Sequence, residues 1–184
     1  MKQVKLLLTV AIVASIGIST GAFIMSTDGE VVQVQQEIHS SYHEIPFSYM
    51  AKNTEYAIIG TVTKITPIVV ETDKMNPTVF SDITVQVEQD LDGKYAGDTF
   101  TVRNIGGETR ELKTTHDAAA DVKVGERILF FAVKEPSSMF GDNYYIAGLK
   151  QGKISLENGM ASGYHTFDSS EVDLIKEIKT LRDK

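Results

Sequence analysis

The sequence predicts a mainly β protein, a small barrel or sandwich with one C-terminal helix. Residues 128–133 (ILFFAV) form an unbroken apolar run of strand length, which is typical of a strand covered on both faces. Residues 81–91 alternate between apolar and polar side chains, as a half-buried strand does. After Ser170, apolar residues recur at helical spacing. Together these patterns indicate a β domain followed by a helix.

The N-terminus is a hydrophobic segment with a basic start. Lys2 and Lys5 precede residues 6–25, which carry no charge, so we expect an export signal or a membrane-spanning helix, with a buried core helix as the alternative. Its most apolar part, 6–18, has the length of a signal, and small residues follow it without a clean Ala-x-Ala cleavage site. The two lysines hold the N-terminus in the cytoplasm in both cases. We therefore expect an extracytoplasmic protein, either secreted or anchored to the cell membrane.

The sequence divides into four segments. Residues 1–25 are the signal peptide or the membrane anchor. Residues 26–48 are a polar spacer, in which Pro46 disfavours a helix. Residues 49–168 are the β domain, and residues 169–184 are an amphipathic helix that packs on it.

The first half of the domain shows three strands. We expect a helical turn at 49–55 and strands at 56–65, 81–91 and 99–103. Gly60 interrupts the first strand where a bulge or a close backbone approach fits. The side chains expected to face inward on these strands are Tyr56, Ile58, Val62, Ile83, Val85, Val87, Leu91, Phe100 and Val102.

The rest of the domain surrounds the apolar run. Residues 108–124 are polar with a patch of alanines, and we expect a long connection with a short helix. Two short strands are expected at 144–149 and 152–156. The Asn158-Gly159 pair predicts a tight turn into Met160-Ala161.

The final helix has a recognisable start. Ser170 is expected to be its N-cap, with Asp173 in the capping-box position three residues later. The side chains expected to form its apolar stripe are Val172, Leu174, Ile175, Ile178 and Leu181.

The order of elements is that of an OB-fold barrel: a long bulged strand, a hairpin, a connection with a helix, and two more strands. The stretches 56–62 (YAIIGTV), 83–87 (ITVQV), 97–102 (GDTFTV) and 125–131 (GERILFF) resemble a group of exported prokaryotic domains of unassigned function. Their layout is similar to the netrin-like OB barrels of metalloproteinase inhibitors, and the likeness covers about residues 50–160. The resemblance implies a small OB-like closed barrel. Those inhibitors bind the protease zinc through an N-terminal cysteine, which this chain lacks.

Charge and cysteine content exclude several functions. Beyond residue 25 the chain has 16 basic and 25 acidic side chains, a net charge of −9. Nucleic acids and anionic lipid headgroups bind through Lys and Arg, so we expect neither as a partner, and contact with the membrane only through residues 1–25. The absence of cysteine excludes disulfides and thiolate zinc sites.

Two motifs offer metal-ligand chemistry. The acidic turn Glu88–Gly93 places carboxylates at alternate positions before a glycine, as a calcium loop does, but Thr99 stands where the bidentate glutamate belongs. An ordinary hairpin turn is the alternative. His39 and His43 have the four-residue spacing of a zinc helix, but Ser40 replaces the glutamate base of a metalloprotease.

No catalytic motif is complete. His116-Asp117 and His165 have no evident nucleophile in the sequence, and Gly106-Gly107 lacks the Lys-Ser or Lys-Thr step of a phosphate loop. We therefore expect no catalytic, cofactor-binding or metal-binding residues.

Aromatic residues offer one further binding surface. The pairs Phe130-Phe131 and Tyr144-Tyr145 supply rings for a nucleic-acid stacking platform, but such platforms lie in positively charged grooves. The negative charge of the chain favours the alternative, core packing with one exposed tyrosine.

The function we expect is a non-enzymatic extracytoplasmic domain that binds a protein or another component of the cell envelope. The first alternative is a metal-dependent hydrolase that uses His39, His43 or His116 with nearby carboxylates. The second is a protease inhibitor that acts through the barrel edge without cysteine.

Overall fold

The computed structural model describes residues 33–39, 43–72, 75–134, 142–165 and 169–183. The hydrophobic segment 1–25 lies outside these residues, so its role as signal or anchor stays a prediction. Among the described residues, no helix combines the length and the apolar character that crossing a membrane requires.

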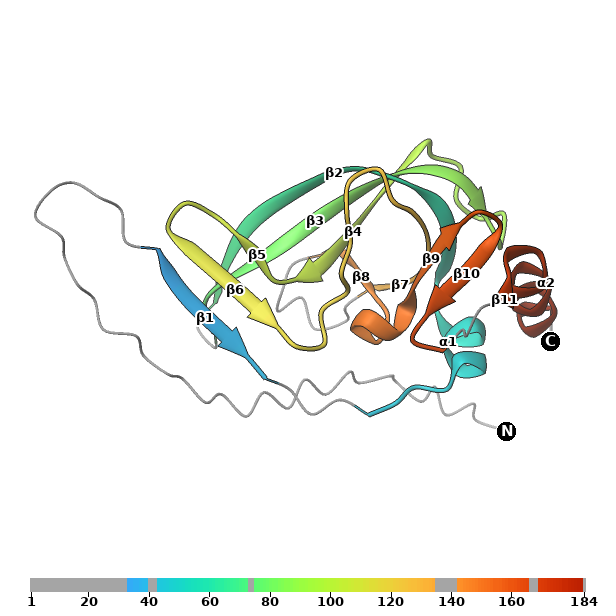
Figure 1. The fold of residues 1–184 in the computed structure, drawn as a ribbon, viewed down its shortest axis with the longest axis horizontal. Helices are drawn as coiled ribbons and strands as arrows, with labels where there is room; N and C mark the ends of the chain where they lie inside the picture. The colour runs from blue at the N-terminus through green and yellow to red at the C-terminus, as the bar shows by residue number, and fades with distance from the viewer. Residues whose placement is uncertain (1–32, 40–42, 73–74, 135–141, 166–168, 184) are drawn as a thin grey trace, which may run out of the picture.

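The fold is mainly β with a C-terminal helix, as predicted (Figure 1). The strands are β1 (Val34–Ile38), β2 (Tyr56–Thr72), β3 (Met75–Asp90), β4 (Thr99–Ile105), β5 (Gly107–Glu108), β6 (Leu112–His116), β7 (Arg127–Lys134), β8 (Tyr144–Ile146), β9 (Lys153–Glu157), β10 (Met160–Gly163) and β11 (Ser169–Ser170). The helices are α1 (Phe47–Asn53), the 3-10 turn η1 (Leu149–Gly152) and α2 (Glu171–Arg182).

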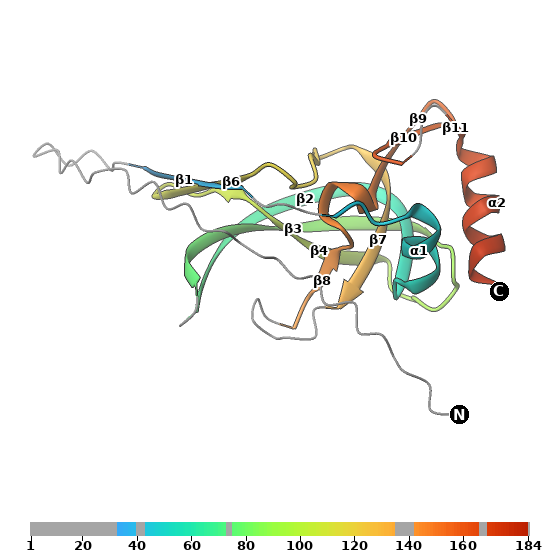
Figure 2. The same cartoon turned by 90° about the horizontal axis from the view of Figure 1, so that it is seen from below.

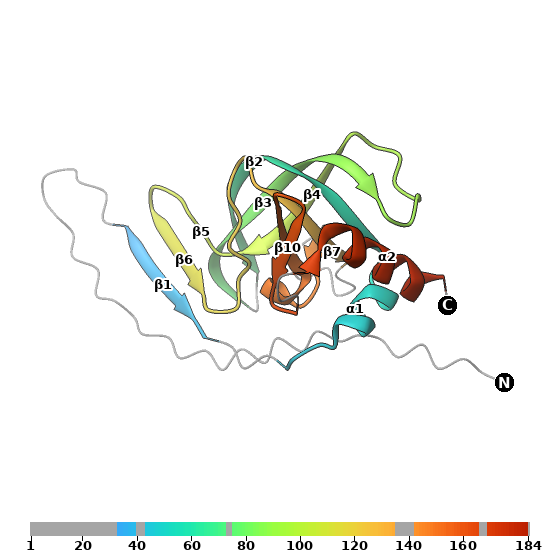
Figure 3. The ribbon, with the colours of Figure 1, turned by 45° about the vertical axis from the view of Figure 1, so that its right-hand side comes forward.

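The strands form one large mixed sheet and one small sheet. The large sheet has the order β11-β10-β9-β7-β2-β3-β4-β8, and the small one has the order β1-β6-β5. Strand β8 also pairs with β7, so β2, β3, β4, β8 and β7 form a partial ring. Helices α1 and α2 lie side by side at one end of the molecule, and β1 lies beyond β6 at the other end (Figure 3).

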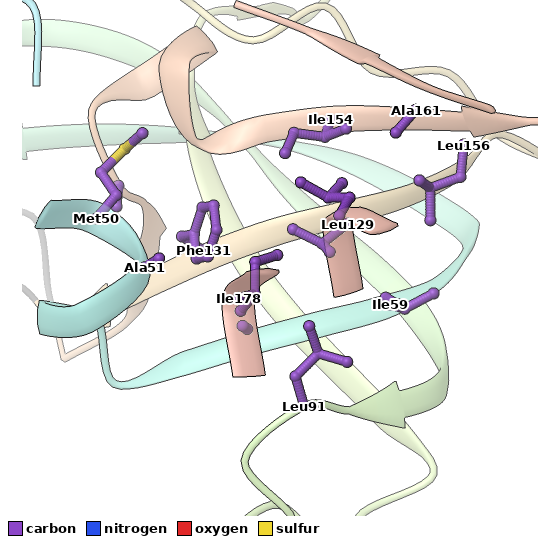
Figure 4. Close-up of a cluster of buried hydrophobic side chains, with 13 residues drawn as sticks. Met50, Ala51, Ile59, Leu91, Leu129, Phe131, Ile154, Leu156, Ala161 and Ile178 are labelled. Carbon is purple, nitrogen blue, oxygen red and sulfur yellow. The ribbon is translucent and has the colours of Figure 1, made fainter. Parts of the chain in front are cut away.

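Strand β7 lies at the centre of the core, as its apolar run predicts. It pairs with β2 on one side and with β9 on the other. Ile128, Phe130 and Ala132 belong to one buried group, the inner cluster, whereas Leu129 and Phe131 belong to a second, the helix-side cluster. The helix-side cluster also receives side chains from α1, α2, β9 and β10 (Figure 4). The strand is therefore covered on both faces.

Strand β2 is bulged at Gly60, as predicted. Its pairing with β3 shifts register between Ile59 and Gly60. A Cβ on Gly60 would lie 2.2 Å from the carbonyl oxygen of Gln86, so glycine allows the two backbones to approach. Both strands are longer than predicted, because the outer parts that end at Thr72 and begin at Met75 pair with each other.

The connection at 108–124 contains strands, and the helix predicted there is wrong. Strands β5 and β6 form a hairpin, and no helix is present between Gly107 and Val124. The Thr114 hydroxyl accepts the Val79 N–H at 2.9 Å, which ties β6 to β3. The Asn104 side chain donates to the Ala120 carbonyl at 2.9 Å, and such contacts with distant parts of the chain outweigh the helix propensity of the alanines.

The last strands differ slightly from the prediction. Strand β8 ends at Ile146, and η1 takes the place of the expected bend. Asn158 and Gly159 form the turn between β9 and β10, both with positive φ, which confirms that prediction.

Helix α2 begins as the sequence predicts. The Ser170 hydroxyl accepts the Asp173 N–H at 3.1 Å and donates to the Asp173 carboxylate at 2.6 Å. Leu174 and Ile178 are buried in the helix-side cluster. Val172 is 74% exposed, so its assignment to the apolar stripe is wrong.

Replacing Ser170 with Ala removes this cap. We expect a loss of about 1 kcal/mol in the free energy of unfolding, because the Asp173 N–H loses its partner at the helix terminus. Urea unfolding measures the change. The control is Ser162→Ala at an exposed position on β10, for which no change is expected. Equal effects of the two substitutions would show that the cap contributes nothing.

Candidate functional site

A solvent-open cavity of about 340 Å³ lies between β3, β4, the β5–β6 hairpin and the segment that follows β6. Its apolar lining includes Ile65, Ile83, Ile105 and Val122. Its volume is at the lower end of the range for small-ligand sites, about 300–1,000 Å³. The cavity is the candidate site because polar side chains also converge on it. The polar side chains in its lining are Ser81, Asn104, Thr114, Thr115, His116 and Asp121.

The buried polar side chains bind the backbone of the walls. Asn104 donates to the Ala120 carbonyl at 2.9 Å and accepts the Ala120 N–H at 3.4 Å. The Ser81 hydroxyl donates to the Gly106 carbonyl at 2.8 Å. Thr114 accepts from β3 and donates to the Gln36 side chain at 3.0 Å. These bonds use the hydrogen-bonding capacity of the walls to fix their shape.

Gly106 and Gly107 form part of the same wall. Both have positive φ, and a Cβ on Gly107 would lie 2.7 Å from the Ser81 hydroxyl oxygen. The backbone at Gly106 and Gly107 therefore passes close over β3 at the cavity wall, where a larger residue would not fit.

His116 lies in the cavity wall with its side chain buried. Its Nδ1 accepts the Ala118 N–H at 3.0 Å, which places the proton of the neutral ring on Nε2. Burial lowers the pKa of His116, and the nearby Asp117 carboxylate opposes this shift. His116 is therefore neutral at pH 7 and holds the turn that follows β6.

The Asp117 carboxylate lies between His116, its neighbour in the sequence, and His39, which comes from a distant segment. Its carboxylate oxygens are 3.5 Å from His116 Nδ1 and 3.6 Å from His39 Nδ1. The predicted pair His39 and His43 shares no helix, and the His43 carbonyl accepts from Gln151 at 3.1 Å. Among the described residues, no three His, Asp or Glu side chains could hold a metal ion together.

The acidic turn has internal partners for its carboxylates. Glu88 accepts from Arg127 Nε at 2.6 Å, and Asp92 forms an ion pair with Arg182. Asp90 accepts three backbone N–H groups of the turn at 2.7–3.1 Å. This geometry is that of a hydrogen-bonded hairpin turn.

The remaining sequence candidates lie away from the cavity. Phe130 and Phe131 are fully buried. The Tyr144 ring packs edge-on against the Tyr56 ring, with 5.3 Å between the ring centres. Burial raises the pKa of Tyr144 to about 12. The His165 and Phe47 rings pack together with 6.4 Å between their centres, and burial lowers the pKa of His165. Phe130 and Phe131 form core contacts, as predicted, whereas Tyr144 and Tyr145 are both partly buried, so the prediction of one exposed tyrosine in this pair is wrong.

Asn104 and Thr114 are site residues that the sequence analysis missed. Neither belongs to a motif, and they reach the cavity from strands β4 and β6. Only the Gly106-Gly107 pair gave a local signal, since paired glycines mark an unusual backbone.

Stability is expected to fall in acid because of His116. Its pKa is lowered in the fold, so below about pH 6.5 the unfolded chain binds the proton more readily. The melting temperature should therefore decrease from pH 7.5 to pH 5. In His116→Asn the decrease should be smaller, because Asn retains an acceptor for the Ala118 N–H and does not titrate.

The control for this experiment is His43→Asn, at an exposed position. His43→Asn should follow the pH profile of the wild type. If His116→Asn also follows that profile, His116 does not contribute to the loss of stability in acid.

The chain matches no protein-family model, no curated protein and no solved structure. The resemblance to exported OB-like domains therefore stays an expectation from the sequence.

Proposed function

We propose that this protein is a non-enzymatic extracytoplasmic binding domain, and that the cavity beside β6 receives part of a protein or of another cell-envelope component. The observation that supports the proposal is the cavity itself, which combines an apolar lining with polar groups at fixed positions. We also propose that the partial ring of five strands is an OB-like closed barrel, exported by means of residues 1–25.

Binding is favoured over catalysis by the state of the polar groups. A general base must have a nitrogen or oxygen that can receive a proton from the substrate. His116 Nδ1 instead accepts a backbone N–H, and Asn104 and Thr114 bond within the walls. These side chains therefore shape the cavity.

The proposal is tested by blocking the cavity. Ala119 is a partly exposed lining residue, and Ala119→Leu would fill part of the space. The matched control is Ala96→Leu, at an exposed position outside the lining. Full-length wild type and both variants are cross-linked in intact cells, and the captured extracytoplasmic partners are identified.

A partner captured by wild type and Ala96→Leu but lost from Ala119→Leu would support the proposal. Capture of the same partner by all three proteins would place binding elsewhere on the molecule. Recovery of the protein from the cytosol would contradict the extracytoplasmic part of the proposal.

A metal-dependent hydrolase remains the second candidate from the sequence, although no group of three His, Asp or Glu side chains among the described residues could hold a metal ion. Metal analysis of the purified chain separates the two functions. One equivalent of zinc that is lost in His39→Ala would favour the hydrolase.

A further inference from the structure

The segment between β6 and β7 forms one wall of the cavity and runs past the large sheet on its way to β7 (Figure 2). Residues 117–122 contain no helix or strand, yet their backbone groups have fixed partners. The Ala118 carbonyl accepts the Lys150 N–H at 2.9 Å, and the Asn104 side chain binds both the N–H and the carbonyl of Ala120. This wall therefore holds the residue that follows Ala120 in a defined position at the cavity.

That residue, Asp121, gives the cavity its charge. His116 also lines the cavity, but burial lowers its pKa and keeps it neutral at pH 7. Among the described residues of the lining, Asp121 is therefore the only one that is charged. Its side chain is 86% exposed, so the carboxylate lies where the cavity opens to water.

The cation that now pairs with Asp121 is held weakly. The Lys123 ammonium lies 3.9 Å from the Asp121 carboxylate, and the Lys123 side chain is 78% exposed. Ion pairs between such exposed side chains contribute little free energy, because water and salt screen them. A cation from a binding partner can therefore replace Lys123 at small cost.

The apolar lining of the cavity suits a hydrocarbon chain. Ile83 and Ile105 are buried, and Ile65 and Val122 are half-buried beside them. An uncharged apolar group would cover this surface but would make no ion pair with Asp121. A lysine or arginine side chain matches both features, because its stem packs on apolar surface while its charged end stays in water.

We propose that the cavity recognises a lysine or arginine side chain from a basic segment of a partner protein, with the stem on the apolar lining and the cation on Asp121. The charge of −9 beyond residue 25 supports this choice, since it attracts basic partners and repels acidic ones. The inference rests on the proposed binding function and adds the chemistry of the group that is bound.

The test compares two peptides that differ by one ammonium group. The first is a short Gly-Ser peptide, blocked at both ends, with a central lysine. In the second, norleucine replaces the lysine, which keeps the stem and removes the charge. Each is titrated into the full-length chain in nonionic detergent micelles, and NMR shifts of the cavity amides report binding. We expect wild type to bind the lysine peptide about two- to fivefold more tightly, as an exposed ion pair contributes.

Three variants locate the contact. Asp121→Asn should bind the two peptides equally, because the carboxylate is lost. Asp98→Asn removes the same charge at an exposed position outside the lining, so it should keep the preference for lysine. Ala119→Leu should weaken binding of both peptides, because it fills part of the cavity.

Equal shifts from the two peptides in wild type, or no shift from either, would overturn the inference. Equal loss of the lysine preference in Asp121→Asn and Asp98→Asn would also overturn it, since the whole negative surface would then be responsible. The proposed function can stand without the inference. A cell-envelope partner that is lost from Ala119→Leu but kept by Asp121→Asn would support binding in the cavity and would contradict recognition of a cation.

Discussion

Replacing Arg182 with Met is expected to destabilise the protein by about 3–5 kcal/mol, the range for breaking a buried ion pair from one side. The Arg182 and Asp92 side chains are 8% and 7% exposed. Arg182 also donates to the Thr54 hydroxyl at 2.7 Å, so it joins the end of α2 to the residue after α1. Loss of the guanidinium leaves the buried Asp92 carboxylate with the exposed Lys94 ammonium, 3.9 Å away, in place of a direct hydrogen-bonded cation. Urea unfolding at pH 7 measures the change.

The double variant Arg182→Met/Asp92→Asn separates the buried charge from the lost packing. It should be more stable than Arg182→Met alone, because the buried carboxylate that has lost its hydrogen-bonded cation is removed. Arg110→Met, at an exposed position, should change stability by less than about 0.5 kcal/mol. An effect of Arg182→Met as small as that of Arg110→Met would contradict the prediction.

Replacing Phe130 with Ala should cost about 3–5 kcal/mol. The Phe130 ring is fully buried in the inner cluster and packs edge-on against Phe100 with 5.6 Å between ring centres. Its removal leaves a void at the centre of the core. The midpoint of urea unfolding measures this loss.

Phe130→Leu is the matched control, since it keeps most of the apolar volume. We expect a smaller cost for this change, below about 1.5 kcal/mol. A similar cost for both substitutions would show that ring geometry, and not buried volume, dominates at this position.

Local patterns predicted the elements whose signals are complete within a few residues. The apolar run of β7, the bulge at Gly60 and the Ser170 cap agree with the structure. Each depends on side-chain periodicity or on backbone chemistry at one position, which neighbouring residues determine. The inward direction of Phe100 was predictable for the same reason.

The cavity depends on contacts between distant segments. Thr114 is bound to Val79, and Asn104 to Ala120, over separations of 35 and 16 residues. Such pairs have no local signature, and the alanine patch by itself predicts a helix that the structure does not have. The contact of Asp117 with His39 could not be predicted for the same reason, because it joins distant segments.

The sequence by itself determined a mainly β chain with a buried central strand, a capped C-terminal helix and a strongly acidic composition. The tertiary structure alone decided that β1 pairs with β6, that Gly106 and Gly107 border a cavity, and that Glu88 and Asp92 of the acidic turn pair with Arg127 and Arg182. The physical reason is the distance along the sequence over which each kind of interaction acts. Periodicity and capping act within a few residues, whereas strand register and ion pairing depend on which distant segments the folded backbone brings together.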